Sequence, residues 1–159
     1  MPAAPAPKLM TFLTFRNDAE EAVEFYTSLF ENSEVVRTVR ARAHEPGWPE
    51  GVLQHALFTL DGQSFMCTNM PPPGAKGYED APWDTYAFSP ATAIYVACET
   101  AGEFERYYAA LSEKGEVIMP AGAYEFSSMF AFVTDRFGVS WRLNVTPSGR
   151  RRKAAAAPS

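Results

Sequence analysis

The chain has 159 residues, of which 47% are hydrophobic and 14% aromatic, enough apolar material for one globular domain with a filled core. Its formal net charge is −5, and four of its 14 basic residues cluster at 150–153, leaving 10 basic against 19 acidic residues elsewhere. Such an acidic body argues against nucleic-acid binding, which requires a basic surface. No stretch approaches the ~18 apolar residues of a membrane span. Cys67 and Cys98 lack Cys-x-x-Cys spacing, so we expect them to be buried, reduced cysteines. No apolar core of the kind found in a leader peptide follows Met1, and we therefore expect a soluble, cytoplasmic protein.

The first predicted elements are a strand and a helix. Residues 1–8 alternate Pro with Ala and offer no face to bury, so we expect a disordered tail there. The apolar, aromatic run Leu9–Phe15 predicts a strand. Asn17-x-x-Glu20 has the pattern of a capping box, which predicts that a helix starts at Asn17. Apolar residues at helical spacing then form one stripe, and they are Ala19, Ala22, Val23, Tyr26, Leu29 and Phe30.

Three more strands are predicted after this helix, at 34–42, 52–60 and 64–69. Asp61-Gly62 joins the last two and is a two-residue hairpin signal. The Pro- and Gly-rich segment 71–90 has no periodic pattern, so it predicts a linker and not a domain of its own.

The same order of elements recurs in the second half of the chain. Residues 93–98 predict a strand, and Thr100-x-x-Glu103 predicts a second capped helix. Its apolar stripe consists of Phe104, Tyr107, Tyr108 and Leu111. Three strands follow, at 116–119, 126–134 and 139–145.

The sequence therefore predicts an α+β fold made of two β-α-β-β-β modules. They would form a single domain over 9–146, with modules at 9–70 and 91–146 and the linker at 71–90. Residues 147–159 run from a turn into Arg/Lys and then alanines, which predicts a second disordered tail.

Three segments resemble one known family. They are NDAEEAVEFY (17–26), LDGQSFM (60–66) and DRFGVSW (135–141). Taken together and in this order, they resemble the PhnB-like branch of the vicinal oxygen chelate superfamily, which includes glyoxalase I, extradiol dioxygenases and bleomycin-resistance proteins. The resemblance covers about 8–146.

The resemblance implies an open, barrel-like concave sheet with helices outside and a ligand held in the concavity. It also implies that pairs of chains associate, so we expect a homodimer. Members of this branch often carry the label 3-demethylubiquinone methyltransferase. The chain has no Gly-rich strand-to-helix turn of the kind that holds a nucleotide-like methyl donor, so methyl transfer is not expected.

The superfamily's metal site resembles a ring of four side chains from the first and fourth strands of each module. In this chain those strands offer Met10, Thr11, Phe12, Cys67, Asn69, Thr92, Ile94, Arg142 and Asn144. None of these is His, Asp or Glu, and the two histidines, His44 and His55, lie on or beside other strands. We therefore expect no metal site and no cofactor.

Two residues are candidates for catalysis. His55 is an acid/base candidate because its unperturbed pKa lies near neutrality. Cys67 is a nucleophile candidate, provided that His55 lies beside it to stabilise the thiolate. Both faces of the 52–60 strand contain apolar residues, so the alternation does not tell which face carries His55. The alternative is that both residues only pack in the core.

Five residues are candidates for ligand binding, because they combine apolar bodies with hydrogen-bonding tips or carry a cation: Asn69, Tyr86, Phe130, Trp141 and Arg142. Arg142 could pair with a ligand carboxylate or phosphate through its planar fork. Trp141 could equally be a core residue.

Two classes of function follow from these observations. The first is a metal-free protein that binds a small organic molecule. The second is an enzyme, either a metal-dependent lyase or dioxygenase with ligands placed elsewhere, or a metal-free isomerase or hydrolase assisted by His55.

Overall fold

A computed structural model describes residues 7–73, 75, 77, 79–80 and 86–146. The predicted tails lie outside these residues, apart from positions 7 and 8. The chain divides into two compact units, Met1–Tyr86 and Ala87–Ser159, and their boundary falls within the segment predicted as a linker. Each unit is considered by itself below.

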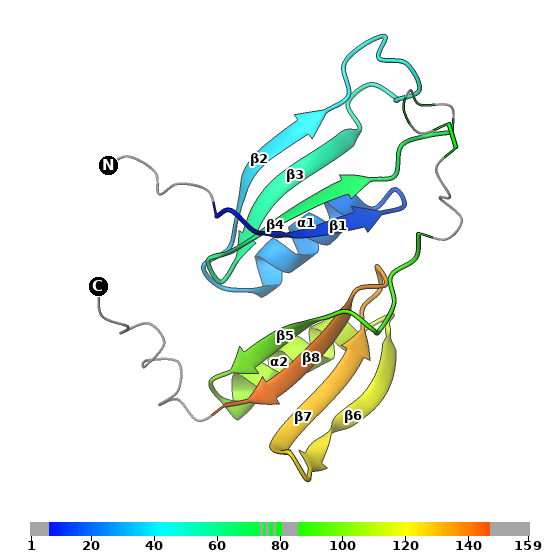
Figure 1. Ribbon diagram of the computed structural model, residues 1–159. Coiled ribbons are helices and arrows are strands. Elements are labelled where there is room, and N and C mark those ends of the chain that lie inside the picture. Colours follow the sequence, from blue (N-terminus) through cyan, green and yellow to red (C-terminus); the bar gives the residue numbers. More distant parts are fainter. Residues whose placement is uncertain (1–6, 74, 76, 78, 81–85, 147–159) are drawn as a thin grey trace, which may run out of the picture. The chain divides into compact units, whose positions relative to one another are not determined.

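The first unit is a four-stranded mixed sheet with one helix against one face (Figure 1). The chain runs through β1 (Thr11–Phe15), α1 (Ala19–Leu29), β2 (Glu34–Arg40), β3 (Leu53–Leu60) and β4 (Gln63–Asn69). The order across the sheet is β1-β4-β3-β2, with β1 and β4 parallel and the other pairs antiparallel. The helix lies between β1 and β2 in sequence and buries Ala19, Ala22, Val23 and Tyr26, as the apolar stripe predicts.

The second unit repeats this plan. It consists of β5 (Ala93–Cys98), α2 (Ala101–Ser112), β6 (Glu116–Tyr124), β7 (Ser127–Thr134) and β8 (Ser140–Val145), in the sheet order β5-β8-β7-β6. The strand β5 is parallel to β8, as β1 is to β4. The predicted α+β fold of two β-α-β-β-β modules is thus confirmed. None of the helices in the described residues is long and apolar enough to cross a membrane.

The two helices start in different ways. At α2 the prediction is confirmed, because Thr100 is the N-cap and its hydroxyl accepts a hydrogen bond from the Glu103 amide at 3.1 Å. At α1 the prediction is wrong. The N-cap is Asp18 and makes no side-chain capping bond, so Asn17 and Glu20 do not form a capping box.

The tight hairpin predicted at Asp61-Gly62 joins β3 to β4. Asp61 and Gly62 have φ of 48° and 78°, and two successive positive values are typical of the turn that follows the twist of a two-residue hairpin. Gly is favoured there because it adopts positive φ without steric cost.

Candidate functional site

A bulge in β3 decides where His55 lies. Between its pairs with Val39 and Arg40 on β2, β3 has Gln54 as an extra, unpaired residue. Beyond this bulge the alternation is regular, so fully buried Ala56 faces α1 and half-buried His55 lies on the opposite face of the sheet.

The structure does not bring Cys67 and His55 together. Cys67 lies opposite Ala56 across the β3–β4 pair, so it shares the face covered by α1 and is fully buried. Burial raises the pKa of the Cys67 thiol from 9.0 to about 11, although a backbone hydrogen bond opposes the shift. The condition set for a Cys67 nucleophile, a His55 imidazole beside its thiol, is therefore not met in this structure. His55 stays a candidate.

We predict that neither cysteine reacts with a thiol reagent while the protein is folded. Burial also raises the pKa of the Cys98 thiol, to about 12, with a smaller contribution from the Glu103 charge. Labelling with Ellman's reagent near pH ~8 should thus proceed only as fast as the protein unfolds, and both thiols should react at once in urea. Because both thiols have their pKa raised on folding, their contribution to stability is fully present below pH 9.0, and it is lost as the pH rises through about 11 for Cys67 and about 12 for Cys98. Rapid labelling at neutral pH would contradict this account.

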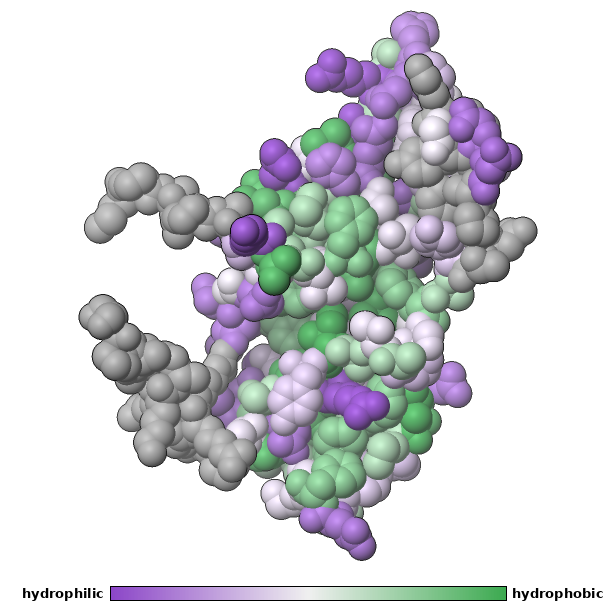
Figure 2. Space-filling model, viewed as in Figure 1, coloured by the Kyte–Doolittle hydropathy of each residue, from purple (hydrophilic) through white to green (hydrophobic). Residues whose placement is uncertain are grey.

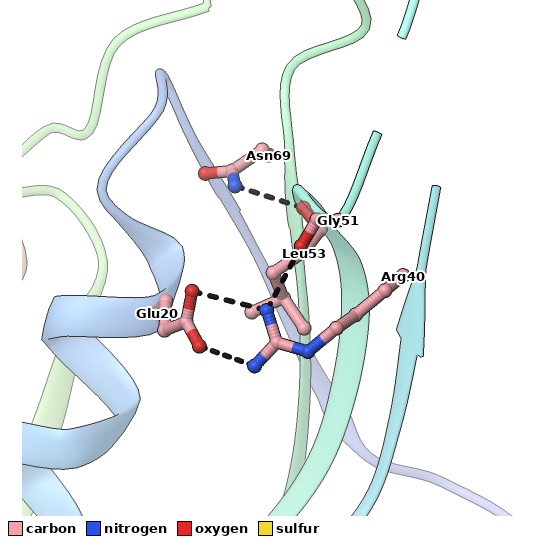
Figure 3. Close-up of polar contacts among 5 residues, drawn as sticks. All are labelled: Glu20, Arg40, Gly51, Leu53 and Asn69. Atoms are coloured by element: carbon pink, nitrogen blue, oxygen red, sulfur yellow. Dashed lines mark hydrogen bonds and ion pairs between the residues drawn. The ribbon is translucent and has the colours of Figure 1, made fainter. Parts of the chain in front are cut away.

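Asn69 on β4 is the hydrogen-bond partner of the first residue of α1. Its Oδ1 accepts a hydrogen bond from the Ala19 amide at 3.0 Å, and its Nδ2 donates to the Leu53 carbonyl at 2.9 Å (Figure 3). The residue is only 4% exposed. Both ends of the amide are therefore used inside the first unit, where Asn69 joins β4 to the start of α1 and to β3.

The Arg40 side chain ties β2 to α1 at the surface (Figure 3). Its guanidinium pairs with the Glu20 carboxylate and donates to the Gly51 carbonyl at 3.1 Å. Hydrogen bonding from Arg40 lowers the pKa of Glu20. Since both side chains are nearly half exposed, this pair contributes little to stability and offers no free cation to a ligand.

Trp141 lies on the opposite face of β8 from Arg142. Its side chain is 1% exposed, and its indole N–H donates to Asp135 Oδ2 at 2.8 Å. Asp135 Oδ1 accepts the Phe137 and Val139 amides at 2.8 and 3.1 Å. The buried carboxylate thus organises the turn between β7 and β8, and Trp141 packs in the core with its one donor satisfied.

The opposite side of the second sheet differs in character. We call it the open face, because no described element of this unit covers it. It carries Tyr95 and Ala97 from β5, Arg142 and Asn144 from β8, and Phe130 and Phe132 from β7. Arg142 is exposed, and its Cζ lies 4.4 Å from the centre of the Phe132 ring. Two predicted ligand residues, Phe130 and Arg142, are therefore on this face, and Tyr86 is 47% exposed in the first unit.

A chain of hydrogen bonds crosses the open face. Asn144 Nδ2 donates to the Tyr95 hydroxyl at 2.8 Å, and Asn144 Oδ1 accepts from the Ser127 hydroxyl. Ser127 Oγ in turn accepts from the Met129 amide at 3.2 Å. The Ser127 hydroxyl also lies 3.1 Å from the Met129 carbonyl, so this chain is anchored to the backbone of β7.

Aromatic rings border this polar chain. Phe130 packs edge-to-face against Phe126 and Tyr124, with ring centres 5.0 and 6.0 Å apart, and Phe126 is 67% exposed. Figure 2 shows hydrophobic residues gathered over this part of the second unit, with hydrophilic residues among them. Apolar walls with few, oriented polar groups are typical of small-molecule sites.

The residues present do not fit the metal ring that the resemblance implies. On two of these strands, the face that points away from the helix carries other residues than the sequence predicts. They are Met66 and Thr68 on β4, and Ala93 and Tyr95 on β5. Neither set contains His, Asp or Glu. Within the described part of the chain, no group of three or more His, Cys, Asp or Glu side chains could hold a metal ion.

We predict that divalent ions will not stabilise the protein. A ligand at about 100 times its dissociation constant adds about 2.7 kcal/mol to the stability of a native state that alone binds it, which raises Tm by several degrees. Thermal melts with zinc, nickel, manganese or iron(II) should coincide with the melt in chelator. An upward shift with any of them would show that a site exists elsewhere in the chain.

Sequence reasoning missed Tyr95, Ser127 and Phe132. Tyr95 is exposed on an edge strand, and the order of apolar and polar residues along 93–98 does not indicate which face of that strand would contact a ligand. The signal was Asn144, which lies two residues beyond Arg142 and therefore shares its face.

Comparisons with known proteins agree with this fold. Residues 7–144 match the family model described as 3-demethylubiquinone-9 3-methyltransferase. The solved structure of the PhnB protein from Bacillus cereus is 41% identical, has a TM-score of 0.76, and the match covers 88% of this chain and 100% of that one. None of the curated proteins compared matches this chain.

More distant structures share the fold. Protein PA1353 from Pseudomonas aeruginosa is 23% identical, with a TM-score of 0.72 and coverage of 89% of this chain and 99% of that chain. A glyoxalase/bleomycin resistance protein from Albidiferax ferrireducens T118 is 14% identical, with a TM-score of 0.50 and coverage of 87% and 98%. At these identities the likeness concerns the fold alone.

Proposed function

Because this chain belongs to the family described as 3-demethylubiquinone-9 3-methyltransferase, the PhnB-like branch of the vicinal oxygen chelate superfamily, we propose that it binds a small organic molecule on the open face of its second sheet. The observation that carries the proposal is the composition of that face. It holds the exposed cation of Arg142 and a chain of hydrogen-bonded polar groups beside aromatic rings. A sheet face with only a structural role would be either uniformly apolar and packed or uniformly polar and in water.

The strand-to-helix turns argue against methyl transfer despite the family's description. A nucleotide-like methyl donor is bound by a Gly-rich turn between a parallel strand and a helix. Here the turn from β1 to α1 is Arg16-Asn17-Asp18 and the turn from β5 to α2 is Glu99-Thr100, and neither contains Gly. We therefore propose binding without a cofactor as the primary activity.

A steric block tests this proposal without disturbing charge. Ala97 lies on the open face beside Asn144, so Ala97→Phe would fill the space that a ligand needs. Ala109 is exposed on α2, so Ala109→Phe is a matched control. Each protein would be incubated with a small-molecule extract of bacterial cells, desalted and denatured, and the released compounds identified by mass spectrometry.

We expect a defined compound to be retained by the wild type and by Ala109→Phe, and lost in a folded Ala97→Phe protein. Equal retention by all three proteins would place the compound elsewhere. Retention of no compound by the wild type would contradict the proposed function.

An enzyme is the second candidate, because half-buried His55 lies on the side of the first sheet that faces away from α1, and an imidazole is the most frequent general acid or base in enzymes. The retained compound separates the two functions. If its mass and isomeric form are unchanged after incubation, the protein only binds it. Conversion that disappears in His55→Gln while binding persists would establish a His-assisted isomerase or hydrolase.

We further propose that the chain is a cytoplasmic homodimer. Four of its strands, β1, β2, β5 and β6, end their sheets and leave backbone groups free for pairing. The free, buried cysteines suit a reducing compartment. Sedimentation equilibrium should give twice the chain mass of 17.6 kDa, and a mass of 17.6 kDa at micromolar concentration would rule out a stable dimer.

A further inference from the structure

The open face of the second sheet holds a row of three aligned side chains. Arg142 on β8 lies opposite Tyr95 on β5 and opposite Phe132 on β7. Neighbouring strands are about 4.8 Å apart, so groups in one row reach the same small ligand. The row therefore places a cation, a hydroxyl and an aromatic ring side by side.

Arg142 is available to a ligand. In the residues that the structure describes, no carboxylate forms an ion pair with Arg142. Its guanidinium lies over the Phe132 ring at 4.4 Å, which orients the planar group while leaving its edge N–H donors free. In a chain of net charge −5, an exposed and oriented cation of this kind matches a negatively charged partner.

The hydrogen-bond chain orients a second donor. Ser127 Oγ accepts the Met129 amide, and its hydroxyl faces two acceptors, Asn144 Oδ1 and the Met129 carbonyl. Asn144 then donates through Nδ2 to the Tyr95 oxygen at 2.8 Å. With its oxygen already accepting, the 57% exposed Tyr95 directs its own O–H outward as a donor.

Taking the open face as the binding site proposed above, we propose that the ligand is a small aromatic or apolar molecule. It carries an oxyanion group, which is either a carboxylate or a phosphoryl group. Two oxygens of that group accept from the Arg142 guanidinium and from the Tyr95 hydroxyl. The organic body of the ligand packs against the exposed ring of Phe126, which the buried Phe130 supports edge-to-face. Carboxylate and phosphoryl oxygens share this chemistry, since both match the planar donor fork of Arg.

Three probes of similar size test the charge requirement: benzoate, phenylphosphonate and the neutral benzyl alcohol. Dissociation constants would be measured from amide shifts in ¹H–¹⁵N spectra. We expect saturable binding of one or both anions, with the tighter anion identifying the oxyanion class. Benzyl alcohol should bind at least about tenfold more weakly, the loss expected when a charged hydrogen bond is absent.

Substitutions then assign the donors. Arg142→Gln should weaken anion binding at least about tenfold, Arg142→Lys should recover part of it, and Tyr95→Phe should weaken it about fivefold. The matched control is Arg106→Gln, since Arg106 also lies over a ring, Tyr107 at 5.2 Å, but is on α2. It should bind the anions as the wild type does.

Three outcomes would overturn this inference. They are equal binding of benzyl alcohol and the anions, undiminished anion binding in a folded Arg142→Gln protein, and no saturable binding of either anion. The first two leave the proposed function intact, because the face would still bind a small molecule. Failure of the proposed function itself is recognised separately, by the absence of any retained compound in the wild type.

Discussion

Asp135→Ala is expected to destabilise the protein by about 3–5 kcal/mol, a large share of the 5–15 kcal/mol typical of a domain. The substitution leaves the amides of Phe137 and Val139 and the indole of Trp141 without their acceptor. Unpaired buried donors cost more than the net value of the bonds they lose. Urea unfolding followed by tryptophan fluorescence and circular dichroism measures the loss.

A double-mutant cycle isolates the Asp135–Trp141 bond. Asp135→Asn keeps one oxygen for the backbone amides but turns an NH₂ group towards the indole N–H, so two donors face each other. Trp141→Phe removes that indole donor. The double variant should therefore be less destabilised than the sum of the two single variants. Strict additivity would contradict the bonding described for this buried carboxylate.

Asn69→Ala is expected to cost about 2–3 kcal/mol, because it leaves the Ala19 amide and the Leu53 carbonyl without partners in a buried place. The control is Asn17→Ala, which removes the residue that the sequence pattern indicates as the cap. Asn17 is exposed, so its loss should change stability by no more than about 0.5 kcal/mol.

The free energies of unfolding of Asn69→Ala and Asn17→Ala are measured by urea denaturation and compared. If Asn17→Ala costs as much as Asn69→Ala, then α1 is capped locally and the long-range bond contributes little. Asn69→Asp gives a finer test. It keeps an acceptor for Ala19 but sets a carboxylate oxygen against the Leu53 carbonyl, so we expect a loss close to that of Asn69→Ala.

These cases show what the sequence can and cannot predict about the fold. The order of strands and helices was predictable because apolar residues recur at the periods of helix and strand. Thr100 was recognisable as a cap because its partner, Glu103, is three residues away. The start of α1 was mispredicted because its acceptor, Asn69, comes from a strand 50 residues further along the chain.

The candidate site was less predictable, for a physical reason. The faces of β3 could not be assigned, because the bulge at Gln54 breaks the alternation that such an assignment relies on. Arg142 was identifiable because it is a cation on the last strand, at one of the positions where the resemblance implies a metal ligand. Tyr95 and Asn144 acquire their roles only through pairing across strands, which no local pattern encodes.

A crystal structure of the protein with the retained compound, or with phenylphosphonate, tests most directly whether the open face of the second sheet is the ligand site. We predict oxyanion oxygens within hydrogen-bonding distance of the Arg142 guanidinium and the Tyr95 hydroxyl, with the organic body against Phe126. A ligand bound elsewhere, with these three side chains untouched, would contradict this prediction.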